Sequence, residues 1–364
     1  MMAFLRRMFA PFVGVFLASV TLLLFLWVHF LKTSVIYRDE GVRYTVQEGA
    51  SLHSVIHELY LLDVIRQPLF FRVLVDSRFN VHSLKAGEYF FPKGTTPARL
   101  LTQITTGTGM VYHEFTVVAG WTFHRLRDTL RRDTNLKHES NALSDREIMT
   151  QLGHPEMNPE GMFFPDTYFF VRGTSDMVVF RQAFAKMEKV LDKAWRGRES
   201  GLPFNTPQEA LTAASLIEKE TALGYERPMI AGVIINRLNK NMLLQIDPTV
   251  IYAAGASFDG TIHRKDLLRK SPYNTYVTKG LPPTPIGIPG LESINAVMHP
   301  VHHDYYYFVA KNFNMDGPHR FSTTLQEHYQ AIGRAKRKKS RMEFFNNALI
   351  WHYFGRKVLP GIYS

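Results

Sequence analysis

The sequence predicts an α+β protein in which a single N-terminal transmembrane helix precedes two folded parts. Three observations predict it: an apolar run over residues 9–31, the pattern of a small α/β module over residues 42–107, and a partial repeat of that pattern inside residues 114–331. A basic and aromatic C-terminal extension, residues 332–364, follows. A chain of 364 residues that is 45% hydrophobic is long enough for two domains with their own cores.

The N-terminal apolar run, from Phe9 to Leu31, contains no Asp, Glu, Lys or Arg. As a helix it would be about 34 Å long, enough to cross a hydrocarbon core of about 30 Å. A cleaved signal peptide would have a shorter apolar core, followed by small residues at the cleavage site. The run continues instead into Lys32-Thr33-Ser34-Val35, which is a poor cleavage site. We therefore expect an uncleaved single-pass anchor.

The charges that flank this anchor leave its orientation open. Arg6 and Arg7 precede the run, whereas Lys32 and Arg38 follow it, so the positive-inside count is nearly balanced. The short tail formed by residues 1–8, in front of a large following domain, favours a cytoplasmic N-terminus.

The small module, residues 42–107, begins with alternating apolar residues at Val42–Val46, which predict a half-buried strand. Ser51 can cap the next helix. The inner face of that helix consists of Leu52, Val55, Ile56, Leu59 and Leu62. A second strand is expected at Glu88–Phe91. A last helix is expected from Thr96-Pro97, because threonine is a good N-cap and proline fits the first helical position.

Both halves of this pattern recur later in the same order. The first half aligns Tyr44-Thr45-Val46, Gly49, Ser51 and Leu59 with Phe115-Thr116-Val117, Gly120, Thr122 and Leu130. The second half aligns Tyr89-Phe90-Phe91 and Lys93-Gly94-Thr95 with Tyr168-Phe169-Phe170 and Arg172-Gly173-Thr174. The second copy carries an insertion at residues 133–160, which we expect to be a loop or a short helix because it is rich in Asn, Asp and Ser.

Three helices are expected after the repeat, at residues 178–193, 207–223 and 228–240. Thr206 and Pro207 mark the start of the second one, and Gly224 marks its end. Proline and glycine then recur between residues 248 and 290, which excludes one long helix. We expect ordered loops and short elements there, a common setting for functional sites.

Glu218 is the carboxylate that periodicity singles out within the 207–223 helix. It shares a helix face with Ala214, Ser215 and Ala222, small residues that leave room for a ligand. An apolar setting raises the pKa of a carboxyl group, which suits a general acid. Glu220 lies about 200° around the helix from Glu218, so the two are not expected to share a task. The alternative is that Glu218 is an ordinary surface or capping carboxylate.

Aromatic and amide side chains are frequent after Glu218, and together they offer flat apolar faces with polar groups, as sugar rings require. This set consists of Asn236, Gln245, Tyr252, Tyr273, Asn274 and Tyr276. The sequence contains no cysteine, Walker A loop, dinucleotide-binding fingerprint, HExxH motif or G-x-S-x-G elbow. His53 with His57, and the group from His299 to Asp304, are better explained as surface and loop residues than as ligands, so no metal is expected.

Several long motifs resemble those of the MltG (YceG-like) endolytic murein transglycosylases. They are Glu160-Gly161, Phe164-Pro165-Asp166-Thr167-Tyr168, Ala214–Thr221, Val233–Leu238, Leu244–Tyr252, Ser271–Tyr276, Gly280–Ile286, Tyr307–Ala310, Phe321-Ser322 and Glu327-His328. The resemblance covers residues 40–331. Thr284 stands where the family usually has glycine, and Ile288-Pro289-Gly290 stands where it has Asn-Pro-Gly.

The resemblance implies an inner-membrane anchor, a LysM-like module at residues 42–107 and a YceG-like catalytic domain at residues 114–331 that faces the cell wall outside the cytoplasmic membrane. It implies cleavage of the bond between N-acetylmuramic acid and N-acetylglucosamine in nascent glycan strands, with 1,6-anhydro ends as product and no cofactor. Glu218 would donate a proton to the glycosidic oxygen and then take one from the muramyl 6-hydroxyl group. Asp247 could be a second carboxylate or only a helix cap.

The family further suggests glycan polymerases and the elongation or division machinery as partners. Two other classes stay open: a non-catalytic peptidoglycan-binding anchor, and a nucleic-acid-binding membrane protein suggested by the net charge of +11. The resemblance implies no nucleic acid. The basic run that begins at Arg334, with the aromatic residues after it, could lie on an anionic bilayer or pack on the catalytic domain.

Overall fold

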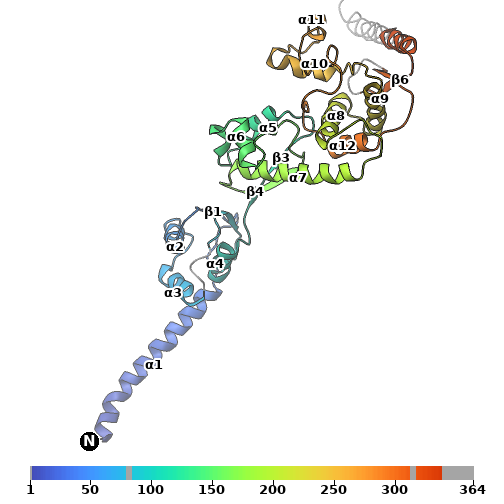
Figure 1. Ribbon diagram of the computed structural model, residues 1–364. Helices are drawn as coiled ribbons and strands as arrows, with labels where there is room; N and C mark the ends of the chain where they lie inside the picture. The colour runs from blue at the N-terminus through green and yellow to red at the C-terminus, as the bar shows by residue number, and fades with distance from the viewer. Residues whose placement is uncertain (1, 79–83, 312–316, 338–364) are drawn as a thin grey trace, which may run out of the picture. The chain divides into compact units, whose positions relative to one another are not determined.

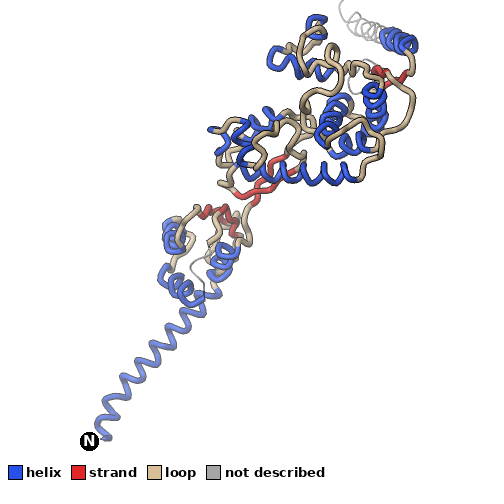
Figure 2. Tube along the Cα trace, viewed as in Figure 1, coloured by secondary structure: helices blue, strands red, loops and turns tan. Residues whose placement is uncertain are grey.

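The computed structural model describes residues 2–78, 84–311 and 317–337, and it divides into two compact units (Figure 1). The first unit consists of residues 1–114, 135–137 and 169–174, and the second unit consists of the rest. Most of the extension at residues 332–364 lies outside the described residues, so its interpretation stays a prediction. Figure 2 shows strands only as short stretches of the chain, whereas helices and loops make up most of the second unit.

The N-terminal helix α1, Met2–Lys32, is the one described helix long and apolar enough to span a membrane, over Phe12–Lys32. Its last turns belong to the core of the first unit. The ring of Phe30, which is 4% exposed, lies 5.2 Å from the ring of Phe71, centroid to centroid. Trp27 packs edge-on against Phe70 at 6.0 Å. The C-terminal end of the apolar run therefore completes a protein core.

The rest of the first unit has the order β1 (Val42–Val46), α2 (Leu52–Leu61), α3 (Pro68–Arg78), β2 (Gly87–Phe91) and α4 (Pro97–Thr106). β1 pairs antiparallel with β2, with Tyr44 opposite Tyr89. The predicted N-caps are confirmed, because the side chains of Ser51 and Thr96 accept hydrogen bonds from the backbone of α2 and α4. The sequence analysis did not predict α3.

β3 (Tyr112–Thr116) pairs with β4 (Thr167–Val171), and the division between the two units falls within both strands. Thr122 caps α5 (Phe123–Leu130) as predicted. Gly120 has φ +81°, close to the +78° of Gly49, its counterpart in the proposed repeat. The insertion contains a short 3-10 helix, η1 (Glu139–Ala142), and α6 (Asp145–Gln151), which starts with a capping box.

The second unit continues with elements that bracket the candidate site. They are α7 (Asp176–Arg196), α8 (Pro207–Glu220), η2 (Gly224–Glu226), α9 (Arg227–Asn239), α10 (Asp247–Ala254), η3 (Gly255–Ser257), α11 (Arg264–Leu267), α12 (Leu291–Met298), β5 (Tyr307–Ala310) and β6 (His319–Ser322). β5 and β6 pair antiparallel. Helix α8 ends three residues earlier than expected, because Thr221 is extended at φ −144° and its hydroxyl accepts a hydrogen bond from the Leu223 N–H group. Ala222 is therefore not on the helix face of Glu218.

Candidate functional site

The carboxylate of Glu218 lies at the N-terminus of α12. Its Oε2 accepts hydrogen bonds from the Gly290 N–H group at 2.9 Å and from the Ser293 hydroxyl at 2.7 Å. Its Oε1 lies 3.4 Å from a guanidinium nitrogen of Arg227. The Glu218 side chain is only 8% exposed. A carboxylate in this position accepts from a backbone donor at the helix end and is stabilised by the helix dipole. Glu218 therefore connects α8 to α12.

The helix face beside Glu218 does not leave room for a ligand, contrary to the prediction. Ala214 and Ser215 are fully buried. The loop before α12 packs over them, with the Ile286 N–H group donating to the Ser215 hydroxyl at 3.0 Å and Ile288 fully buried. The small residues of α8 thus allow the loop before α12, and not a ligand, to approach the helix closely.

Glu220, the last residue of α8, has different surroundings. Its side chain keeps partial exposure, yet Oε2 is buried and has no hydrogen-bond partner among the described residues. Burial, together with the nearby charge of Asp247, raises the pKa of Glu220 to about 8. A carboxyl group of this kind is protonated at neutral pH and can donate its proton, as general acid catalysis requires.

Asp247 begins α10 and is exposed. Its Oδ1 accepts a hydrogen bond from the Tyr276 hydroxyl at 2.5 Å. Burial and the charges of Asp247 and Glu220 raise the pKa of Tyr276. Glu220, Asp247 and Tyr276 therefore form one cluster at the C-terminal end of α8 and the start of α10.

Gln245 is close to this cluster in sequence and is exposed, with a left-handed backbone at φ +52°. Its side-chain oxygen lies 3.4 Å from a guanidinium nitrogen of Arg237. That guanidinium is buried and also donates to the carbonyl groups of Leu243, Leu244 and Tyr306. Arg237 thus holds the chain segment that leads from α9 to Asp247.

A second cluster surrounds Glu160. The Glu160 side chain accepts hydrogen bonds from the Phe123 N–H group at 2.9 Å and from the Tyr252 hydroxyl at 3.1 Å. The ring centroids of Tyr252 and Tyr273 are 4.9 Å apart, and the Tyr273 hydroxyl lies 2.9 Å from that of Thr284. Burial raises the pKa of Glu160 to about 7 against the lowering effect of these bonds and of Lys219.

The two asparagines predicted to bind sugar have other partners. The Asn236 amide donates to the carbonyl oxygens of His303 at 2.7 Å and Tyr305 at 3.1 Å. Asn274 is fully buried, and its amide donates to the carbonyl groups of Asp266, Leu267 and Arg269. Both side chains hold loops in place, and that of Asn274 is not accessible to a sugar in this structure.

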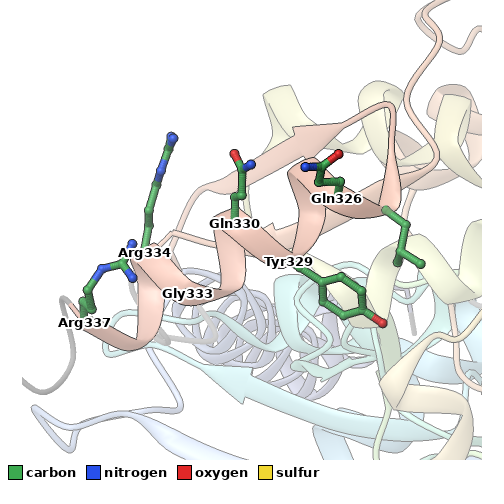
Figure 3. Close-up of a pocket in the computed structure, with 7 residues that line it drawn as sticks. Gln326, Tyr329, Gln330, Gly333, Arg334 and Arg337 are labelled. Atoms are coloured by element: carbon green, nitrogen blue, oxygen red, sulfur yellow. The ribbon is translucent and has the colours of Figure 1, made fainter.

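A pocket of about 570 Å³ opens beside the second cluster. It is lined by Phe123, His124, Asp145, Arg146, Pro155, Glu156, Met157, Asn158, Pro159, Glu160 and Tyr252. A larger hollow of about 770 Å³ lies along one helical segment, 325–337, and none of the candidate residues lines it (Figure 3). The pocket of about 570 Å³ is therefore lined by both Glu160, whose pKa is raised, and Tyr252, a predicted sugar-binding residue.

The structure thus brings Asp247 and Tyr276 into one cluster and Tyr252 and Tyr273 into another. The sequence analysis did not predict this grouping, and it missed Glu160 and Glu220 as titratable groups. Glu220 was set aside because it points away from Glu218. Glu160 had a usable signal, since it is a lone charge directly before the run Gly161–Pro165, which has no charged side chain.

Comparison with known proteins gives concordant matches. The YceG-like family model matches residues 44–334. An endolytic murein transglycosylase of Bacillus subtilis strain 168 is 31% identical over 309 residues, 80% of this chain and 83% of that protein. One of Streptococcus pneumoniae serotype 2 is 27% identical over 296 residues, 73% of this chain and 53% of that protein. The crystal structure of a putative YceG-like protein from Listeria monocytogenes matches with a TM-score of 0.50 and 26% identity, covering 80% of this chain and 99% of that one.

Proposed function

This chain belongs to the YceG-like family, and on that premise we propose that it is an endolytic murein transglycosylase. It cuts nascent peptidoglycan strands between N-acetylmuramic acid and N-acetylglucosamine and leaves 1,6-anhydromuramyl ends, which terminates or trims the strands during wall assembly. The observation that carries this proposal beyond the family match is Glu220, a carboxyl group with a buried unpaired oxygen and a raised pKa in a cluster of polar side chains.

One carboxyl group is enough for this reaction because the substrate supplies its own nucleophile. The protonated acid gives its proton to the glycosidic oxygen, and the bond from that oxygen to muramyl C1 breaks. Positive charge develops at C1, as in other glycosidic cleavages. The ionised carboxylate then takes the proton of the muramyl 6-hydroxyl group, and the oxygen of that hydroxyl group bonds to C1. The carboxyl group ends protonated again, and no water is consumed.

We assign the acid role to Glu220 because its carboxyl group can hold a proton at neutral pH, whereas the sequence analysis assigned the role to Glu218. Both oxygens of Glu218 accept contacts from donors, and protonation would weaken the bonds from Gly290, Ser293 and Arg227. Glu218 is proposed to hold α12 in place, and its predicted role as the acid is tested beside Glu220.

The proposed sugar contacts are Gln245, Asp247, Tyr252, Tyr273 and Tyr276, all of which are exposed or partly exposed. Tyrosine faces pack on the apolar faces of sugar rings, and their hydroxyls bond to sugar hydroxyls. Asn236 and Asn274 are proposed to position the loops that carry these residues.

The deciding experiment is mass spectrometry of nascent glycan strands treated with the detergent-solubilised full-length protein. Wild type is expected to produce 1,6-anhydromuramyl ends. Glu220→Gln should lower the rate by a factor of about 10²–10⁴, as the loss of a general acid does. Glu218→Gln should keep most activity but unfold at a lower temperature. The reverse ranking would restore Glu218 as the acid, and reducing ends would indicate a hydrolase.

The alternative function is a non-catalytic peptidoglycan-binding anchor. It predicts that wild type binds strands without shortening them and that Glu220→Gln changes neither binding nor glycan length.

The anchor helix is compatible with single-pass membrane attachment. We propose that it lies in the cytoplasmic membrane with the N-terminus inside and both folded parts outside. Residues 42–107 are proposed to form a LysM-like module. β3, α5 and β4 are proposed to be a partial duplicate of its pattern, because both share the positive-φ glycine and the helix cap. Glycan polymerases and the elongation or division machinery are the proposed partners. No nucleic acid is proposed as a ligand.

A further inference from the structure

Glu160 is a buried carboxyl group that the proposed reaction does not use. It is 6% exposed, and it connects two elements far apart in sequence: its Oε1 accepts from the Phe123 N–H group in the first turn of α5, and its Oε2 accepts from the Tyr252 hydroxyl on α10. The same two side chains, Glu160 and Tyr252, line the pocket of about 570 Å³. A pocket of this volume is large enough for sugar units.

Tyr252 also connects Glu160 with the rest of the site. Its ring packs at 4.9 Å against that of Tyr273, whose hydroxyl reaches Thr284. The helix that carries Tyr252 begins at Asp247, whose charge acts on Glu220. The state of the Tyr252 hydroxyl therefore bears on the wall of this pocket.

We propose that Glu160 is a positioning residue whose protonation sets the direction of its hydrogen bond with Tyr252, and thereby whether Tyr252 can donate to a sugar in the pocket. This proposal rests on the proposed function. An ionised carboxylate only accepts, so the Tyr252 hydrogen is committed to Glu160. A neutral carboxyl group can donate from Oε2 while Oε1 still accepts from Phe123, and the Tyr252 hydrogen then becomes free to bond to a sugar oxygen.

The surroundings of Glu160 place its change of protonation near neutral pH. Burial favours the neutral form and raises its pKa to about 7, whereas the Phe123 and Gly161 N–H groups, the Tyr252 hydroxyl and Lys219 favour the ionised form. The other titratable groups that line the pocket each lie beside a partner: His124 lies 3.2 Å from Asp128, Asp145 pairs with Arg127, and Arg146 pairs with Glu156. Glu160 is thus neutral below about pH 7 and ionised above it.

The test measures binding of short glycan strands at pH 5.5 to 8.5 by full-length Glu220→Gln protein in detergent, in which cleavage and the titration of Glu220 are both removed. Affinity is expected to fall by a factor of about 2–10 as pH rises through 7, the loss of one hydrogen bond. Adding Glu160→Gln should abolish this pH dependence and keep the high affinity at every pH, because the amide accepts from Phe123 and donates to Tyr252, as the neutral acid does.

A matched variant separates this role from mere packing. Tyr252→Phe, with Glu160 intact, should bind at the low affinity at every pH because it lacks the hydroxyl. Thermal unfolding of each variant shows that it is folded, and a packing role alone would change the unfolding temperature without flattening the pH dependence. The same pH dependence in the Glu160→Gln protein overturns the proposal for Glu160. Absence of strand binding at every pH in all variants instead counts against the proposed function.

Discussion

Glu218 and Glu220 are separated by one residue, yet their carboxyl groups have opposite surroundings. Glu218 accepts two hydrogen bonds at the start of α12 and faces Arg227, so its charge is compensated. Glu220 has an unpaired buried oxygen and a carboxylate, Asp247, as its neighbour. Glu220 is the last residue of α8 and lies directly before Thr221, where the backbone becomes extended. This unpaired oxygen is the reason why we propose Glu220, and not Glu218, as the acid.

The pKa of Glu220 gives a prediction for the pH dependence of cleavage. A general acid must be protonated, so kcat should be full well below pH 8 and fall as pH rises through about 8. Asp247→Asn removes a neighbouring negative charge, which lowers the pKa of Glu220 and should move the alkaline limb of kcat to lower pH. Asp259→Asn, in the exposed segment after η3, is the control and should leave the limb in place. An unchanged limb in Asp247→Asn would exclude Glu220 as the group that titrates.

At the scale of elements, local sequence signals predict where helices start, whereas contacts between distant parts of the chain are not predicted by them. The starts of α2, α4, α5 and α8 could be predicted because an N-cap is a local feature, a Ser or Thr oxygen that bonds to a backbone group three residues on. The end of α8 has a local cause, the hydrogen bond from the Leu223 N–H group to the Thr221 hydroxyl. The loop packed on Ser215 could not be predicted, since it depends on a contact about 70 residues away. The pairing of Glu220 with Asp247 and of Glu160 with Tyr252 has the same origin.

The buried pair Glu226 and His319 shows how such contacts stabilise elements, because it joins η2 to β6. The two side chains are 4% and 7% exposed, and they lie 2.7 Å apart. The Glu226 carboxylate also accepts from the His319 N–H group at 2.8 Å. Glu226→Ala leaves these buried donors unpaired and should lower the free energy of unfolding of the second unit by about 3–5 kcal/mol, measured by denaturant unfolding.

The matched control for this pair is Glu156→Ala, which breaks the exposed ion pair with Arg146. That change should cost no more than about 1 kcal/mol, as is usual for surface ion pairs. Equal losses in both variants would mean that the buried pair contributes no more than an exposed one.

At the scale of the whole molecule, one helix serves two environments. Residues 12–26 of α1 present apolar side chains that no described residue buries, as a membrane span requires. The last turns instead contribute Trp27, Phe30 and Leu31 to the core of the first unit. The sequence analysis predicted the helix as an anchor alone, because hydropathy does not distinguish a side chain that faces lipid from one that faces a protein core.

This double use predicts that the anchor cannot be removed at its obvious boundary without cost. A truncated variant that begins at residue 33 loses Phe30, which is 4% exposed and packs against Phe70 and Phe71. The first unit of this variant should unfold at a lower temperature than that of a variant that begins at residue 25. Loss of a buried phenylalanine costs about 3–5 kcal/mol.

Phe30→Ala in the longer variant should reproduce most of the loss, whereas Phe25→Ala, at a side chain that is 65% exposed, should not. Amide hydrogen exchange should locate the loss in α3 and α4 and leave α8 and α12 unchanged. Equal protection of α3 in both truncated variants would mean that the last turns of α1 belong to the membrane span and not to the core of the first unit.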